Sequence, residues 1–347
     1  MRVVVVGATG NVGTSVVEAL VSEPAVDEII GVARRMPEWE PPKTQWRTAD
    51  VGSDELTPLL QGADAVVHLA WLFQPTHDPK TTWRVNVGGS ERVFRAAAGA
   101  GVRTLVYASS VGAYSPGPKD RKVDETWPTH SLPTAAYGRE KAYVERMLDA
   151  FEGDNPQIRV VRMRPAFIFK RESASEQRRL FAGPLLFGRL VRPSLIPVVP
   201  DVPGLCFQTL HASDAAEAYR LAVVGDAAGA FNLASDPVVD PARLGELLGA
   251  RVVPVPAWPV LGAAALAWRL HLVPADPALV DLFLQLPLMD AGRAERDLGW
   301  KPAVSSLDAI SEFLAGLGAK AGMATPPLDP RSGGRLREIL TGVGQRP

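Results

Sequence analysis

The sequence predicts an α/β fold in which a doubly wound parallel sheet is followed by a smaller C-terminal lobe. In the first half of the chain, short runs rich in valine and isoleucine alternate with longer helical patterns, which is typical of βαβ units. Several runs are apolar throughout, as expected of strands that are buried on both faces of a sheet. A glycine-rich turn separates the first run from the first helical pattern.

The elements of the sheet follow in a regular order up to residue 165. The first run, RVVVV, is continuous and apolar, and EIIGVAR, DAVVHLA, TLVYAS and RVVRM share its character, while TQWRT is a shorter strand after the second run. We predict strands at residues 2–6, 28–34, 44–48, 64–70, 104–109 and 159–163, and helices near residues 11–22, 53–61, 80–100 and 135–152. The first half is therefore one layered unit of the nucleotide-binding type.

The pattern changes after the Arg164-Pro165 pair. A charged stretch, KRESASEQRR, and several prolines come first, and FQTLHASDAAEAYRLAVV then indicates a strand and a helix. We predict a dinucleotide-binding Rossmann domain over residues 1–165, to which the chain returns at about 205–235. Residues 166–204 and 236–318 would form a substrate-binding lobe. Residues 319–347, rich in proline and glycine, are expected to be a tail that becomes disordered or lies along the surface.

Composition limits the classes of partner. The 347 residues are 46% hydrophobic, enough for a large core, and the formal net charge is -1. Basic residues are spread along the chain, so we expect no nucleic-acid partner and no anionic membrane surface, and small neutral or anionic ligands stay open. The single cysteine, Cys206, fits a reducing compartment, and the five histidines lack the spacing of metal ligands. We therefore predict a cytoplasmic protein with no metal site.

Two apolar stretches are shorter than membrane-directed segments. The four valines at the N-terminus are too few for the apolar region of a signal peptide and indicate a buried strand. The stretch VLGAAALAW at residues 260–268 has about half the length that spans a bilayer. We expect it to be a packed helix rather than a membrane contact.

The spacing G-x-x-G-x-x-G at Gly7, Gly10 and Gly13 indicates a loop that binds the pyrophosphate of a dinucleotide. Glycines there allow a tight turn and a close approach of backbone amides, and the helix N-terminus favours negative charge. The second strand ends in GVARR, with Arg34 and Arg35 and no acidic residue. Because an arginine at this place accommodates a 2′-phosphate, we predict a preference for NADP over NAD, the alternative being a pair of surface arginines.

Tyr137 and Lys141 are four residues apart on a predicted helix, so they share one face. An ammonium near a phenol stabilises the phenolate and lowers the pKa of the tyrosine, which suits it to general acid/base chemistry. Ser109 and Ser110 end the fifth strand at the carboxyl edge of the sheet, where open α/β folds bind ligands. His68 ends an apolar strand and is expected to be buried and hydrogen-bonded rather than a ligand.

These features together resemble the extended short-chain dehydrogenase/reductase family, also described as the NAD-dependent epimerase/dehydratase family. The resemblance covers most of the chain. It rests on GATGNVG, ADV at 49–51, VVHLA at 66–70, NVGGS at 86–90, VYASSVGAY, YGREK, MRPAFIF, LHASDAAEAY and LGWKP.

The resemblance implies a role for each matching position. Ser110, four residues before Tyr114, would hold the substrate oxygen, and Tyr137 would be the general acid/base. Lys141 would bond the nicotinamide ribose, and Asn86 would lie near the active site. With the residues of the glycine-rich loop and the two arginines after the second strand, the predicted cofactor-binding residues are Gly7, Thr9, Gly10, Asn11, Val12, Gly13, Arg34, Arg35, Asp50, Val51, Leu69, Ala70, Tyr137, Lys141, Arg164, Pro165 and Ala166. The helices at 80–100 and 135–152 resemble those that form a homodimer interface in this family.

Departures from the family pattern indicate which substrates the protein could bind. Val111 and Gly112 stand where nucleotide-sugar dehydratases carry an Asp-Glu pair, and AFIFKRES lacks the asparagine that many nucleotide-sugar epimerases carry after the Arg-Pro turn. In the loop AWLFQPTHDP, Trp71, Leu72 and Phe73 would suit an apolar or ring-shaped substrate, or would simply pack the two lobes together. A basic cluster could hold a diphosphate or carboxylate, or could be a solvated helix face. Its members are Lys170, Arg171, Arg178 and Arg179.

Three functions stay open at this point. The favoured one is an NAD(P)-dependent oxidoreductase that transfers hydride to or from a secondary alcohol or ketone. The first alternative is a nucleotide-sugar epimerase that retains NAD, and the second is a non-catalytic NAD(P)-binding sensor. The intact set of Ser110, Tyr137 and Lys141 argues against a sensor, which has no need of it.

Overall fold

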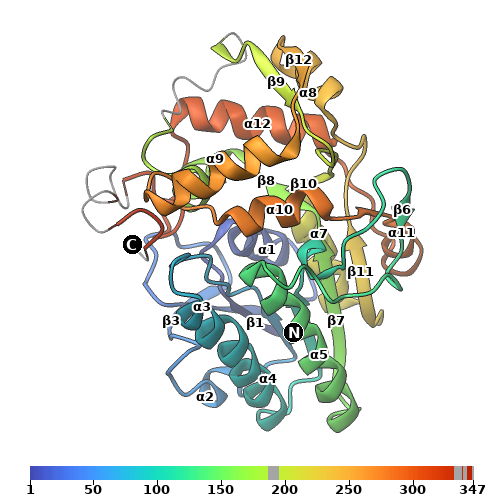
Figure 1. Ribbon diagram of the computed structural model, residues 1–347. Coiled ribbons are helices and arrows are strands. Elements are labelled where there is room, and N and C mark those ends of the chain that lie inside the picture. Colours follow the sequence, from blue (N-terminus) through green and yellow to red (C-terminus); the bar gives the residue numbers. More distant parts are fainter. Residues whose placement is uncertain (187–194, 332–337, 339–341, 346–347) are drawn as a thin grey trace.

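The central sheet has seven parallel strands and dominates the N-terminal half of the molecule (Figure 1). A computed structural model describes residues 1–186, 195–331, 338 and 342–345. The strands are β1 Arg2–Val6, β2 Glu28–Ala33, β3 Thr44–Thr48, β4 Ala65–His68, β5 Thr104–Ala108, β7 Arg159–Pro165 and β11 Gly229–Leu233. Their order across the sheet is β11-β7-β5-β4-β1-β2-β3, so the chain winds outward in both directions from β1. The predicted Rossmann-type fold is confirmed.

Helices cover both faces of this sheet. On one face lie α1 Asn11–Val21, α7 Ala212–Val224 and α11 Gly292–Leu298. On the other lie α2 Thr57–Leu60, α4 Gly89–Gly99 and α5 Ala136–Asp154. The valines of β1 alternate between the two cores, with Val3 and Val5 in the first and Val4 and Val6 in the second. A strand buried on both faces has to be apolar throughout, which explains the RVVVV run.

Two predicted helices differ from the structure. The helix expected over 53–61 contains only Thr57–Leu60, because Pro58 lacks a backbone N–H and is tolerated only in a first turn. The helix expected over 80–100 is continuous but not uniform. It consists of α3 Pro79–Trp83, a π-helical turn Arg84–Gly88, and α4. Such π-turns occur frequently at functional sites, and Asn86 lies within this one.

The C-terminal half adds short two-stranded sheets and helices. The strand pairs are β8 Phe167–Phe169 with β10 Thr209–His211, β9 Val198–Asp201 with β12 Arg251–Pro254, and β6 Lys122–Val123 with β13 Leu288–Met289. The helices are α6 Ala174–Gln177, α8 Pro241–Leu248, α9 Ala257–Arg269, α10 Pro277–Gln285 and α12 Ser306–Ala319. Val111 and Tyr114 from the sheet side pack with Leu282, Leu286 and Met289 in a third apolar cluster. This cluster joins the two halves, while the predicted domain boundaries stay predictions.

The apolar stretch at 260–268 belongs to α9, which packs against α10. No helix in the described part of the chain is long and apolar enough to cross a membrane.

The described part of the predicted tail is ordered along the surface. Beyond α12 the chain passes over the N-terminal half, and Thr325 and Leu328 are buried there. Residues 332–337, 339–341 and 346–347, which also belong to the predicted tail, lie outside the described residues.

Candidate active site

The glycine-rich loop connects β1 to α1 at the point where the strand order reverses. Gly7 has a φ of +89°, and a Cβ placed on it would lie 2.6 Å from the amide nitrogen of Ala70. A Cβ on Gly13 would lie 2.3 Å from the Gly7 carbonyl oxygen. Only glycine fits either position, because Gly7 packs against the backbone that follows β4 and Gly13 packs against the backbone of Gly7 and Ala8. The structure thus brings Gly7, Gly13, Leu69 and Ala70 together, and a cradle that side chains cannot fill fits a dinucleotide.

The residues predicted for the adenosine end follow β2 and β3. Arg34 and Arg35 are exposed immediately beyond β2. Asp50 accepts a hydrogen bond from the Gly52 amide at 2.9 Å, and Val51 is buried. The preference for NADP over NAD stays a prediction.

Ser110 and Tyr137 meet at the carboxyl edge of the sheet. Ser110 follows β5, and its Oγ accepts a hydrogen bond from the Gly112 amide at 2.9 Å. Its hydroxyl also lies close enough to Tyr137 to lower the pKa of that side chain. A Cβ on Gly112 would lie 2.6 Å from the Tyr137 ring, so glycine is needed for this approach. Ser109 instead donates to Glu145 at 2.6 Å, which confirms that it has an ordinary structural hydrogen bond.

The protonation of Tyr137 differs from the expectation. The sequence predicts a lowered pKa, but burial raises the pKa of Tyr137 to about 12, against the lowering effect of the nearby Ser110 hydroxyl. The ring of Phe73 stacks on that of Tyr137 at 5.4 Å, and the Trp71 ring meets it edge-on at 5.9 Å. In this state the tyrosine is therefore a protonated acid.

Lys141 is on the predicted helix face but is engaged elsewhere. Its Nζ donates to the Ala108 carbonyl at 2.6 Å and lies 3.5 Å from the centre of the Trp71 ring. Burial lowers the pKa of Lys141 to about 7, although the charges of Glu140 and Glu145 act in the opposite direction. The lysine is thus held within reach of the site without a charge strong enough to lower the pKa of the tyrosine.

Asn86 supports the aromatic loop after β4. Its Nδ2 donates to the Leu72 carbonyl at 2.9 Å, and its Oδ1 accepts from the Leu72 amide at 2.7 Å. The same Nδ2 donates to Glu140 at 2.7 Å, and Thr82 donates to the other oxygen of Glu140 at 2.7 Å. Asn86 therefore positions the loop that covers Tyr137, and Glu140 is a buried member of this network that sequence reasoning missed.

Two further predicted residues have structural partners. Arg164 donates to Glu145 at 2.9 Å and to the Tyr114 hydroxyl at 3.0 Å, so its guanidinium is already satisfied, and only the turn it begins with Pro165 and Ala166 is open to the predicted role. His68 is buried and 2.9 Å from the Ser90 hydroxyl, and burial lowers its pKa to about 3. A buried, neutral, hydrogen-bonded histidine confirms the prediction.

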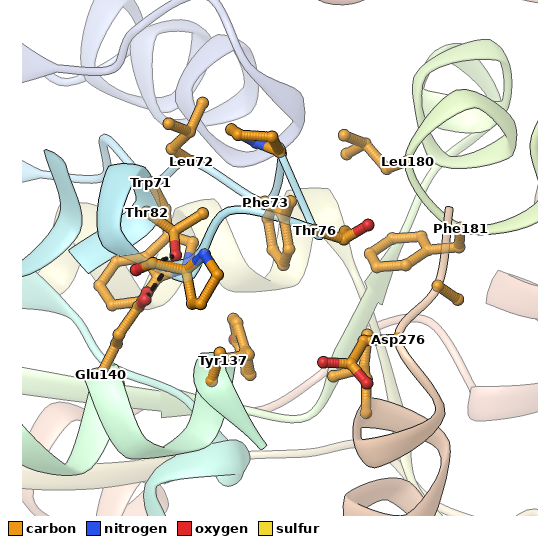
Figure 2. A pocket seen from close by; sticks show the side chains of 15 residues that line it. Trp71, Leu72, Phe73, Thr76, Thr82, Tyr137, Glu140, Leu180, Phe181 and Asp276 are labelled. Atoms are coloured by element: carbon orange, nitrogen blue, oxygen red, sulfur yellow. Dashed lines mark hydrogen bonds between the residues drawn. The ribbon is translucent and has the colours of Figure 1, made fainter. Parts of the chain in front are cut away.

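A pocket lies above Tyr137 between the two halves (Figure 2). Figure 2 shows Phe73 and Tyr137 side by side, with Phe181 further along and with Glu140 and Asp276 on opposite sides. The residues that line it are Trp71, Leu72, Phe73, Pro75, Thr76, Pro79, Thr82, Ala136, Tyr137, Glu140, Leu180, Phe181, Ala275, Asp276 and Leu279. Trp71, Leu72 and Phe73 thus line a pocket. Among the described residues, no lysine or arginine does so.

The predicted basic cluster is not in this pocket. The Lys170 ammonium is buried and donates to Thr14 at 2.6 Å and to Ser15 at 3.0 Å. Arg178 forms an ion pair with Glu338, and Arg179 donates to backbone carbonyls of the C-terminal segment. These three side chains are therefore engaged within the chain, and only Arg171 is exposed. Among the described residues, no group of histidine, cysteine, aspartate and glutamate could hold a metal ion.

Comparisons with known proteins agree with this geometry. Residues 3–182 match the model of the NAD dependent epimerase/dehydratase family. An uncharacterized protein of Mycobacterium tuberculosis is 24% identical over 99% of this chain and 90% of its own length. A sterol-4-alpha-carboxylate 3-dehydrogenase (decarboxylating) of Candida albicans is 31% identical over 48% of this chain and 50% of its own. The UDP-glucose 4-epimerase of Thermus thermophilus, solved in complex with NAD, is 20% identical with a TM-score of 0.67 and covers 91% of this chain and 99% of its own. At that identity the last likeness concerns the fold.

Proposed function

The chain belongs to the NAD dependent epimerase/dehydratase family, and on that basis we propose that it is an NAD(P)-dependent oxidoreductase acting on a secondary alcohol or ketone of an apolar small molecule. The observation that carries the proposal is that the side chains of Ser110 and Tyr137 meet at Gly112, beside an aromatic pocket that Tyr137 lines. A nucleotide-sugar substrate brings a diphosphate, which needs cations or clustered amide donors. The described lining of the pocket has no lysine or arginine and contains Glu140 and Asp276.

The bound dinucleotide would supply or accept the hydride, and the residues of this chain would manage the proton. Gly7, Gly10 and Gly13 would hold the dinucleotide. Ser110 would hold the substrate oxygen. Tyr137, protonated at neutral pH because of its raised pKa, would give its proton to that oxygen during reduction of a ketone. We therefore favour net reduction.

Both the relatives and the residues of the site support an oxidoreductase over a nucleotide-sugar epimerase and over a binding-only sensor. The Candida albicans relative is named a sterol carboxylate dehydrogenase, and an aromatic pocket suits a hydrophobic skeleton. The likeness to epimerases is one of fold, so it does not carry a nucleotide-sugar substrate. A binding-only sensor would not need Ser110, Tyr137 and Lys141 together.

The first test is substitution of the proton donor. We expect Tyr137→Phe to reduce turnover of apolar ketones at least about a thousandfold while changing the Kd for the dinucleotide less than about twofold. Turnover would be followed as oxidation of NADPH and NADH with a panel of ketones. The exposed Tyr143→Phe on the same helix serves as the control. Full activity in the Tyr137 variant would contradict the proposal.

The second test addresses the cofactor. We propose NADP over NAD from Arg34 and Arg35, and expect the protein to bind NADPH at least about fivefold more tightly than NADH. Arg34→Ala with Arg35→Ala should remove this difference. The supernatant of denatured protein should first be analysed for retained dinucleotide, because tightly retained NAD would favour the epimerase.

A further inference from the structure

Asp276 is a charged side chain of the pocket that proton transfer from Tyr137 leaves unused. It directly precedes α10, and Figure 2 shows it on the side of Tyr137 opposite Glu140. Other residues of the pocket lining, such as Phe181 and Leu279, have side chains without a hydrogen-bond donor. Water or a bound molecule therefore has to satisfy what the chain leaves open on this carboxylate.

The other carboxylate of the pocket, that of Glu140, is engaged through both oxygens. Its Oε1 accepts a hydrogen bond from the Thr82 hydroxyl and its Oε2 accepts one from Nδ2 of Asn86, both at 2.7 Å. Glu140 is 1% exposed. It therefore supports the aromatic loop, and a ligand would have to displace Thr82 or Asn86 to reach it.

Asp276 uses one carboxylate oxygen within the chain. Its Oδ1 accepts a hydrogen bond from the Ala278 amide at 2.9 Å and so caps α10. Among the described residues, none donates a hydrogen bond to Oδ2, and no lysine, arginine or histidine forms an ion pair with this half-buried carboxylate. One acceptor of the pocket is thus left for a bound molecule.

Packing fixes the place of Asp276 relative to Tyr137. α10 packs against α5, the helix that carries Tyr137. Leu279, in the first turn of α10, belongs to the apolar cluster that also contains Tyr137. A Cβ on Gly138 of α5 would lie 3.0 Å from the Leu282 side chain of α10, so the two helices are in close contact. The proton donor and the carboxylate are therefore held at two fixed places of one pocket.

A wholly apolar substrate fits this arrangement poorly. A molecule that fills the pocket displaces water from Oδ2, and a carboxylate oxygen that loses water without gaining a donor raises the free energy of the complex. A protonated amine replaces the lost interaction with a charge-assisted hydrogen bond, whereas a substrate carboxylate adds repulsion. The rings of Phe73 and Phe181, 5.5 Å apart, also attract a cation. In the described lining no lysine or arginine competes with it.

From this arrangement we propose that Asp276 binds a protonated amine of the substrate, so that the pocket takes an apolar ketone or alcohol whose amine lies away from the carbon that exchanges hydride. The proposal rests on the proposed function, because Ser110 and Tyr137 have to hold the reacting oxygen. It narrows the substrate class and makes Asp276 a determinant of specificity. The carboxylate takes no part in the proton transfer itself.

The test uses three ring ketones of matched size that carry a dimethylammonium group, an isopropyl group or a carboxylate opposite the carbonyl. The first two groups have nearly the same shape and differ mainly in charge and in the N–H donor. kcat/KM would be measured for each ketone from the oxidation of NADPH and NADH. We expect the ammonium ketone to exceed the isopropyl ketone at least about tenfold and the carboxylate ketone to be the poorest of the three.

Asp276→Asn removes the charge and keeps an oxygen that can cap α10, so this variant should fold. We expect its preference for the ammonium over the isopropyl ketone to fall below about twofold, and its kcat/KM for the carboxylate ketone to rise. Asp281→Asn is the matched control. Asp281 is also in α10, accepts a hydrogen bond from Gln285 at 2.8 Å and lies outside the described lining. The control should keep the preference of the unaltered protein.

The preference is a ratio between two substrates, so a general loss of folded protein or of dinucleotide binding leaves it unchanged. Equal kcat/KM for the ammonium and isopropyl ketones in the unaltered protein would overturn the role of Asp276, and the proposed oxidoreductase would stand. An unchanged preference in Asp276→Asn would do the same. If the unaltered protein turned over no ketone of any kind, the proposed function and the amine site would both be overturned.

Discussion

The ring of Tyr137 packs against the rings of Phe73 and Trp71, and this burial governs the protonation of its hydroxyl. Burial raises its pKa to about 12, so the dinucleotide-free protein should hold it neutral through pH 10.5. We expect the absorbance at 295 nm to be the same for the unaltered protein and for Tyr137→Phe up to that pH. An excess of about one phenolate per chain in the unaltered protein near pH 9 would contradict the burial argument.

For single residues, the sequence predicts where a side chain lies in the fold better than it predicts which groups surround that side chain. Spacing of four places Tyr137 and Lys141 on one helix face, and a strand end places Ser110 near them. Their pKa values depend on Trp71 and Phe73, which reach the site through a loop whose path no local pattern defines.

A buried ion pair connects the helix of Tyr137 to the sheet. Glu145 of α5 is fully buried and bonds Arg164 of β7 at 2.9 and 3.0 Å, and Arg162 at 3.1 Å. Although burial opposes ionisation, Arg164 lowers the pKa of Glu145 to about 2. The pair fixes α5 against β7, and the position of Tyr137 follows from it.

Glu145→Gln should therefore be strongly destabilising. Removing one charge of a buried pair leaves the other uncompensated, so we expect the free energy of unfolding at pH 7 to fall by about 3 kcal/mol. The pKa of this group is depressed, so its contribution is present above pH 4.5 and is lost as the pH falls toward 2. Urea unfolding measures both effects. Glu152→Gln, which removes the half-exposed partner of Arg162, should cost less than about 1 kcal/mol. If the free energy of unfolding fell equally in the two variants, burial would not determine how much each carboxylate contributes to stability.

A helix or strand can be predicted from the sequence where its local residue pattern and its packing in the fold require the same residue types. The six predicted strands all lie in the central sheet. Burial on two faces requires an apolar run in the inner strands, whereas β3, TQWRT, is a partly exposed edge strand. The seventh strand, β11, is absent from the sequence prediction: GAFNL is short and contains Asn232, whose side chain is satisfied only by distant partners such as Tyr114. The π-helical turn at Arg84–Gly88 has no sequence pattern of its own either.

The whole molecule places its chemistry between two unequal halves. The sheet and its helices supply the glycine loop, Ser110 and Tyr137, while the C-terminal half supplies Phe181, Asp276 and Leu279 to the pocket. The first set follows one fold pattern and could be predicted from sequence. The second comes from segments without a shared motif, which is why the substrate class had to be argued from the pocket.

The exposed face of α4 and α5 leads to the last prediction, a homodimer. These helices pack side by side on one face of the sheet (Figure 1). Tyr143 of α5 is 47% exposed there, and its ring lies 4.9 Å from that of Trp83. We propose that this aromatic pair packs against its copy, since large aromatic residues are enriched at interfaces.

Light scattering at micromolar concentration should then give twice the chain mass of 37.1 kDa. Tyr143→Asp should convert the protein to a monomer, because it places a charge in the centre of an apolar contact. Trp258→Asp removes a still more exposed aromatic residue from α9, on the other half of the molecule, and should leave the dimer intact. A monomer mass for the unaltered protein would exclude the dimer. Loss of the dimer in the Trp258 variant alone would move the interface to α9.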